Sequence, residues 1–275
     1  MELVAPSTVR TRMRQARYAM AGAVVAVMVA GCGTSGDKME YEERPVEVLY
    51  NEAMDALETG ETKKAAELFD EVERQHPYSP WATKAQVLSA YSYYEGDQYD
   101  EAVAALDRYI RLHPANPDVP YAYYLKGIAF YERVTDVERD QSMTLEARKA
   151  FEQLVSRYPT SPYARDARLK LDLINDHLAG KEMSVGRFYL RQGHYLAAIN
   201  RFSRVVEDYQ TTTHVPEALH RLAEAYTALG LEEEARRMAA ILGHNYPDSD
   251  WYVDSYELVE NRPVRVREEP WYKFW

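Results

Sequence analysis

The stretch 94–114, "YEGDQYDEAVAALDRYIRLHP", decides the fold. It opens with a glycine turn, continues with apolar residues at helical spacing, and closes with a proline. Ala102 lies in the apolar face, Leu106 follows one turn later, and Pro114 comes twelve residues after the alanine. Because proline cannot continue a helix, the pattern predicts an amphipathic helix that follows a turn and ends before Pro114.

This pattern recurs along the chain. The segments 56–77, 189–210 and 226–247 repeat it, although the second of these lacks the closing proline, and 144–159 repeats its second half. Another apolar stretch with a small central residue precedes each of them. Two antiparallel helices approach closely only where side chains are small. The small residues are Ala53, Ala90, Gly127, Gly186 and Ala223 in the first stretches, and Ala65, Ala102, Ala147, Ala198 and Ala235 in the second.

These repeats resemble the tetratricopeptide repeat. The resemblance implies an all-α solenoid of about five helix pairs over 46–247, without a sheet. Residues 249–259 are expected to form a C-terminal capping helix over the last repeat. Residues 161–192 contain almost no helix breaker, so they predict one long helix that joins repeats three and four.

The N-terminal segment 1–31 has the pattern of an export signal. Four arginines between residues 10 and 17 precede a small, apolar run at 19–30. That run is about a dozen residues long, which is too short for a bilayer that needs roughly 20. The alternative is an anchor that is not cleaved.

Cys32, the only cysteine, follows this run in "VAGC". The motif resembles a bacterial lipoprotein box, which implies cleavage before Cys32 and a covalent lipid on its thiol. Otherwise the cysteine is incidental. The lipid would anchor the chain to the membrane. Gly33 stands where an aspartate would retain a lipoprotein in the inner membrane, so the outer membrane is favoured.

Composition excludes several classes of function. From Cys32 onward the chain carries 29 basic and 43 acidic residues, which disfavours nucleic-acid binding. The sequence has no HExxH, G-x-S-x-G, phosphate-binding loop or dinucleotide fingerprint. We therefore expect that the protein has no enzymatic activity, no metal site, and no cofactor apart from the lipid on Cys32.

The chain has 23 tyrosines and only six phenylalanines, and many tyrosines fall on the predicted concave face. In a tetratricopeptide array the first helix of each repeat lines that face. The sequence therefore predicts a groove for an extended, aromatic-rich peptide in the first three repeats, although some of these tyrosines could instead pack between repeats. Its residues are Tyr50, Met54, Tyr91, Tyr94, Tyr121, Tyr124 and Tyr131.

Four arginines in repeat four predict a second surface, namely Arg187, Arg191, Arg201 and Arg204. A locally basic patch on an acidic protein can dock an acidic partner. A solvated helix face is the alternative interpretation.

Three stretches resemble the BamD (ComL) family of outer-membrane lipoproteins. They are "AAELFDEVERQHPYSPWATKAQVLSAYSYYEGDQYDEA" (65–102), "HPANPDVPYAYYLKGIAFY" (113–131) and "ARKAFEQLVSRYPTSPYARDARLKL" (147–171). The resemblance implies a lipid-anchored scaffold on the periplasmic face of the outer membrane, in the β-barrel assembly (BAM) complex. It further implies that the C-terminal repeats dock a POTRA domain of BamA, near Arg201, beside other lipoproteins of the complex. The N-terminal repeats would recognise the C-terminal signal of unfolded outer-membrane barrel proteins.

Together these features predict five segments. They are a lipoprotein signal peptide (1–31), a lipidated tether (32–45), a substrate-binding half with repeats one to three (46–160), a partner-docking half with repeats four and five and the capping helix (161–260), and a flexible aromatic tail (261–275).

Two other functions combine a lipoprotein box with such repeats. One is a pilotin for secretin assembly, and the other is a scaffold for cell-envelope or division proteins. The tail carries Trp271, Tyr272, Phe274 and Trp275, and it could bind a partner or compete with substrates for the tyrosine groove. The alternative is a disordered end or one that anchors at the membrane interface.

Overall fold

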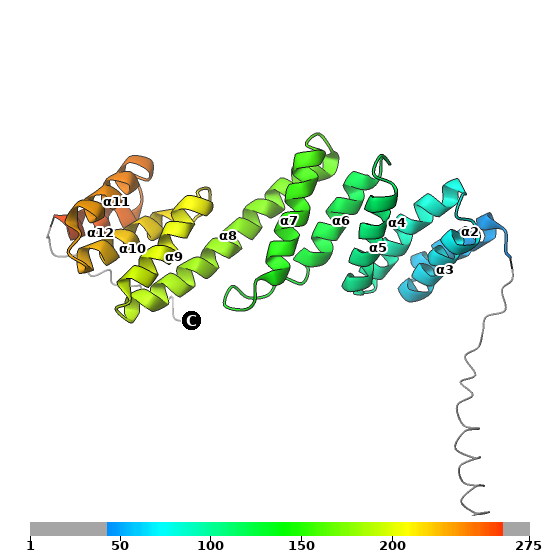
Figure 1. Ribbon diagram of the computed structural model, residues 1–275, viewed down its shortest axis with the longest axis horizontal. Helices are drawn as coiled ribbons and strands as arrows, with labels where there is room; N and C mark the ends of the chain where they lie inside the picture. Colours follow the sequence, from blue (N-terminus) through cyan, green and yellow to red (C-terminus); the bar gives the residue numbers. More distant parts are fainter. Residues whose placement is uncertain (1–42, 261–275) are drawn as a thin grey trace, which may run out of the picture. The chain divides into compact units, whose positions relative to one another are not determined.

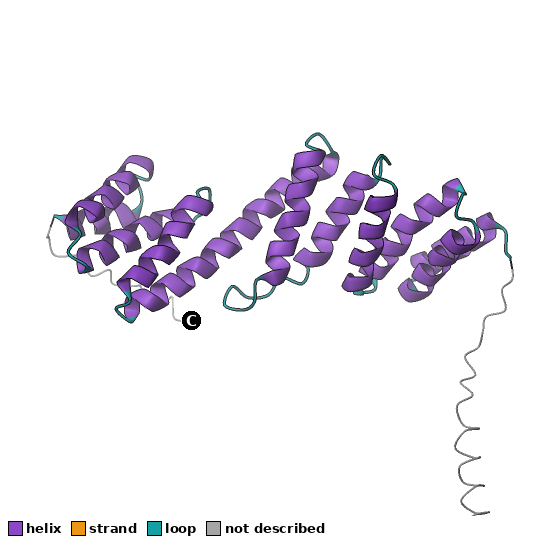
Figure 2. Ribbon diagram, viewed as in Figure 1, coloured by secondary structure: helices purple, strands orange, loops and turns teal. Residues whose placement is uncertain are grey.

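The computed structural model describes residues 43–260, which form eleven helices and no strand (Figures 1 and 2). The predicted signal peptide, Cys32 and the tail 261–275 lie outside the described residues. The helices are α2 (Val46–Glu58), α3 (Thr62–Gln75), α4 (Pro80–Glu95), α5 (Tyr99–Leu112), α6 (Val119–Tyr131), α7 (Ser142–Arg157), α8 (Pro162–Arg191), α9 (Tyr195–Asp208), α10 (Val215–Ala228), α11 (Glu232–Asn245) and α12 (Asp250–Val259).

Consecutive helices pack against each other as antiparallel pairs (Figure 1). The first helices of successive pairs also contact one another, from α2 with α4 to α8 with α10. Contacts limited to nearest and next-nearest helices are the mark of an α-solenoid. The five pairs run from α2–α3 to α10–α11, and α12 covers the last pair by packing on both of its helices. The predicted fold class is confirmed.

The small central residues explain how closely the paired helices approach. A Cβ atom added to Gly127 of α6 would lie 2.4 Å from a ring carbon of Phe151 in α7. The same construction at Gly186 of α8 places Phe202 of α9 at 2.4 Å. Both phenylalanines are fully buried. The alternation of small and bulky residues in the sequence is therefore the contact surface of each pair.

Four of the five turns between paired helices contain one residue in the left-handed conformation, and the α6–α7 loop has none. Gly60, Gly193 and Gly230 have φ angles of 80°, 75° and 75°. In the stretch 94–114 the left-handed residue is Asp97 (φ 57°) and not the neighbouring Gly96. Aspartate tolerates this conformation better than most residues, so the turn survives the change.

Helix α8 spans 30 residues, which confirms the long helix predicted between repeats three and four. The loop before α7 supports it. Lys181 Nζ donates to the Glu138 carbonyl at 2.7 Å, and His177 Nδ1 lies 3.0 Å from Gln141 Oε1. The loop between α6 and α7 therefore contacts α8 of the same chain.

Candidate functional site

Five tyrosines gather on the first helices of neighbouring repeats. Tyr91 and Tyr94 come from α4, Tyr121 and Tyr124 from α6, and Tyr163 from the first turn of α8. The Tyr121 and Tyr163 rings lie 5.4 Å apart, those of Tyr124 and Tyr163 5.5 Å, and those of Tyr91 and Tyr94 6.4 Å. All five are partly buried and rest on one hydrophobic core. We call this group the tyrosine cluster.

Helical spacing explains the arrangement. The pairs Tyr91–Tyr94 and Tyr121–Tyr124 are each three residues apart, so both rings of a pair project from the same face of the helix. Because α4 contacts α6 and α6 contacts α8, these faces join into one surface. The rings lie against the core without being fully enclosed, so part of each one faces solvent.

The pKa values of Tyr91, Tyr94, Tyr121 and Tyr124 are raised, so these four hydroxyl groups stay neutral at physiological pH. Burial raises the pKa of Tyr121. Burial also raises the pKa of Tyr124, whose Oη donates a hydrogen bond to Asp166 Oδ2 at 2.7 Å. A hydrogen bond with Glu95, followed by burial, raises the pKa of Tyr91. The surface therefore offers aromatic faces and neutral hydrogen-bonding tips, which suits aromatic side chains on a polar backbone.

Tyr163 was not among the residues predicted from the sequence. It follows Ser161 and Pro162, and Ser161 caps α8 by accepting a hydrogen bond from the Tyr163 backbone N–H at 3.3 Å. The motif "SPYA" at 161–164 repeats "SPWA" at 79–82, where Trp81 packs on Tyr50 with ring centroids 4.7 Å apart. The recurrence of serine, proline and an aromatic residue was the signal that could have identified Tyr163.

Three predicted groove residues lie outside the cluster. Tyr50 and Met54 pack on the separate core of the first repeat, and Tyr50 lies against Phe69 and Trp81. Tyr131 rests on the same core as the cluster, but its ring faces Lys170, whose Nζ lies 4.9 Å from the ring centroid. The predicted groove residues thus form more than one aromatic group, and their role in peptide binding stays a prediction.

The predicted basic surface divides into two sets of ion pairs. Arg187 of α8 forms two hydrogen bonds, of 2.8 and 2.6 Å, with the carboxylate of Glu217 in α10. Burial raises the pKa of Glu217, but the hydrogen bonds and charge of Arg187 outweigh it, so the net pKa is lowered. This pair joins two first helices and has the geometry of a bidentate clamp.

Arg201 and Arg204 of α9 share one carboxylate, that of Glu182 in α8, at 3.0 Å each. One acid thus faces two cations, and Arg204 keeps more than half of its side-chain surface exposed. Both arginines line an open hollow with Tyr189 and Asn200. Arg191 is exposed at the end of α8. Arg187 and Arg201 each keep 37% of their side-chain surface exposed, so Arg204 is the most open of the three paired arginines, and the docking of an acidic partner at this surface stays a prediction.

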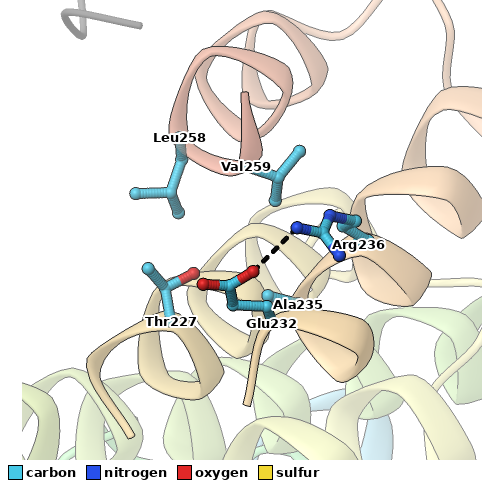
Figure 3. Close-up of a pocket in the computed structure, with 6 residues that line it drawn as sticks. All are labelled: Thr227, Glu232, Ala235, Arg236, Leu258 and Val259. Carbon is cyan, nitrogen blue, oxygen red and sulfur yellow. Dashed lines mark hydrogen bonds and ion pairs between the residues drawn. The ribbon is translucent and has the colours of Figure 1, made fainter. Parts of the chain in front are cut away.

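Further features of the described chain bear on its chemistry. Within residues 43–260, no group of three histidine, cysteine or acidic side chains is placed to hold a metal ion. None of the eleven described helices combines the length and the apolar composition that a membrane span requires. A small hollow of about 30 Å³ between α10, α11 and α12 lies apart from both surfaces (Figure 3).

The sequence of the chain is similar to those of known assembly factors. The family described as "Outer membrane lipoprotein" (YfiO) matches residues 42–242. The outer membrane protein assembly factor BamD of Caulobacter vibrioides is 50% identical over 94% of this chain and 86% of its own length. BamD of Rickettsia prowazekii is 46% identical over 86% and 94%, and BamD of Neisseria meningitidis serogroup B is 34% identical over 90% and 95%.

Similar solved structures are more distant. The TPR2AB domain of yeast Sti1 has a TM-score of 0.41 at 12% identity, over 78% of this chain and 83% of its own. A thermophilic TPR protein of Thermus thermophilus has a TM-score of 0.36 at 17% identity, over 78% and 100%. The sequence relatives carry the assignment. The chain belongs to the BamD family of outer membrane protein assembly factors.

Proposed function

We propose that the chain is a lipid-anchored scaffold of the BAM complex, and that its tyrosine cluster binds the aromatic-ended signal of unfolded outer-membrane barrel proteins. Its membership of the family supports a role in outer-membrane protein assembly, not the pilotin or division-scaffold alternatives. The cluster itself supports the peptide-binding role, since partly exposed rings from three helices surround one apolar surface.

The remaining parts of the proposal concern anchoring and partners. A lipid on Cys32 would hold the repeats on the periplasmic face, close to where barrel proteins are inserted. A POTRA domain of BamA would dock at Arg201 and Arg204, and other lipoproteins of the complex would bind elsewhere. The protein would act by binding alone, without catalysis and without a cofactor other than the lipid.

The chemistry of the cluster favours one class of ligand. An extended peptide projects alternate side chains to the same side, about 6.6 Å apart. The tyrosine pairs of α4 and α6, together with Tyr163 of α8, could receive successive aromatic side chains, while their hydroxyl groups bond to the peptide backbone. A charged peptide segment would gain little from Tyr91, Tyr94, Tyr121 and Tyr124, because their raised pKa values keep these phenols neutral. Asp166 already accepts the hydrogen bond of Tyr124.

A binding measurement tests this proposal. We expect Tyr94→Ala with Tyr121→Ala to weaken the binding of a synthetic peptide with alternating aromatic residues at least about tenfold, since loss of central aromatic anchors typically costs more than 1 kcal/mol. The matched control is Tyr78→Ala, because Tyr78 is 100% exposed outside the cluster. Isothermal titration calorimetry provides the affinities, and circular dichroism checks that the variants fold.

Phenylalanine variants at the same two positions separate packing from hydrogen bonding. Tyr94→Phe with Tyr121→Phe should keep most of the affinity if the rings carry the interaction. Equal affinities for the native chain and the double alanine variant would exclude the cluster as the peptide site.

A further inference from the structure

An apolar edge lies exposed at the turns of the last two repeats. Leu196 at the start of α9 is 69% exposed, and Leu229 and Leu231 in the α10–α11 turn are 38% and 47% exposed. Leu196 and Leu229 line one open hollow of about 420 Å³. We call these three leucines the turn edge. Clustered apolar side chains of this kind commonly mark a binding surface.

The described part of the chain ends directly after α12, beside the turn edge. Leu258 and Val259, at the end of α12, line a small hollow with Thr227 of α10 and Glu232 of α11 (Figure 3). Thr227 is two residues before Leu229. The segment that follows α12 therefore starts next to the α10–α11 turn.

Three acidic residues directly follow the turn edge at the start of α11, and the first of them, Glu232, lines the hollow at the end of α12. Glu232, Glu233 and Glu234 occupy the first turn of α11, with side chains 68%, 90% and 40% exposed. They form ion pairs with Arg236 and Arg237 of the same helix. Exposed pairs of this type are weak, so the carboxylates can accept further cations.

The segment that follows α12 carries cationic residues first and aromatic residues last, with Glu268 and Glu269 between them. Arg262, Arg265 and Arg267 come first, and Trp271, Tyr272, Phe274 and Trp275 come last. We infer that residues 261–275 dock on their own chain, with the arginines on Glu232–Glu234 and the aromatic residues on the turn edge. Fifteen residues can span up to about 50 Å, which leaves ample reach to a neighbouring turn.

Because residues 261–275 belong to the same chain, they are favoured over a separate protein as the ligand of the turn edge. A short tether gives an effective concentration on the order of millimolar, so even weak contacts become populated. The apolar hollow also adjoins the one that holds Arg201 and Arg204, because Ala197 lines both.

Disulfide trapping tests the proposal in the chain from residue 32 onward, with Cys32→Ser removing the native thiol. Leu196→Cys combined with Phe274→Cys should form an intrachain disulfide under mild oxidation. The matched control is Leu169→Cys with Phe274→Cys, since Leu169 on α8 is also exposed, at 62%. We expect the first pair to react at least about tenfold faster than the control.

The other outcomes contradict this assignment. Equal rates for the two pairs would show that the segment does not favour the turn edge, which would leave that edge to a partner protein. Disulfide-linked dimers would assign the edge to a second copy. A faster reaction of Tyr91→Cys with Phe274→Cys would place the aromatic residues on the tyrosine cluster instead.

A charge-reversal variant tests the acidic contact separately. Added to the chain that carries Leu196→Cys and Phe274→Cys, Arg265→Glu with Arg267→Glu should slow disulfide formation about fivefold at low salt. The difference should shrink at 1 M salt, where charges are screened beyond about 3 Å. An unchanged rate at low salt would overturn the assigned pairing with Glu232–Glu234.

Discussion

At the scale of single residues, Gly127 decides how closely α6 and α7 can approach. An alanine there would gain roughly 1 kcal/mol of helix propensity. Its Cβ atom, however, would lie 2.4 Å from the fully buried Phe151 ring, and overpacking of this kind costs about 1–3 kcal/mol. We expect the clash to prevail, so that Gly127→Ala lowers the free energy of unfolding by about 1–2 kcal/mol in urea titrations.

The control for this residue is Gly180→Ala in α8, where the nearest atom, His214 Nε2, would lie 3.3 Å from the new Cβ. That variant should be neutral or slightly more stable, because helix propensity then dominates. Combining Gly127→Ala with Phe151→Leu should recover part of the loss. A Gly127→Ala chain as stable as the native one would contradict the packing argument.

At the scale of helices, α12 depends on a buried histidine. His220 Nδ1 of α10 lies 2.8 Å from Ser255 Oγ, and its ring lies 5.2 Å from that of Trp251. Burial lowers the pKa of His220, and the neighbouring Arg221 lowers it further, against the opposing effects of Glu224, Asp254 and Glu217. The folded chain therefore prefers the neutral imidazole, and acid should loosen α12.

The sign of this effect follows from proton linkage. Below the ordinary pKa of 6.5, the unfolded chain binds a proton at this histidine more readily than the folded chain does. Stability contributed by the neutral ring is thus present above pH 6.5 and is lost as the pH falls below it. We expect His220→Asn to flatten the dependence of unfolding free energy on pH between 7.5 and 5.5, whereas His244→Gln, at an exposed position, should leave it unchanged. Parallel curves for the native chain and His220→Asn would refute the assignment.

The helices also show which features the sequence could predict. The small central residues and the closing prolines act within one repeat, so their spacing was enough to predict the helix pairs. The capping helix α12 was predicted separately, from residues 249–259. Tyr163 was missed because its position next to Tyr121 depends on how α8 packs beside α6. Arg187 was grouped with Arg201 for a similar reason, since its partner Glu217 is 30 residues away.

At the scale of the whole molecule, the two predicted surfaces lie on different parts of the described chain. The tyrosine cluster belongs to α4, α6 and the first turn of α8, whereas Arg201 and Arg204 belong to α9. Peptide binding and partner docking should therefore be separable by mutation. This separation is a property of solenoids, in which each repeat contacts only its neighbours.

Charge reversal at α9 tests that separation. In Arg201→Glu, a new carboxylate would face Glu182, which already serves Arg204, and an acidic partner would be repelled. We expect co-purification with BamA from detergent-solubilised membranes to fall at least about tenfold, because losing one partner of a buried charge pair at an interface typically costs about 2–5 kcal/mol. The affinity for the aromatic peptide should stay within twofold. Arg111→Glu on α5, at an exposed position, is the matched control and should leave both measurements unchanged. If Arg201→Glu weakened both peptide binding and BamA binding, the two surfaces would be coupled. The mutation in α9 would then affect the tyrosine rings on α4 and α6.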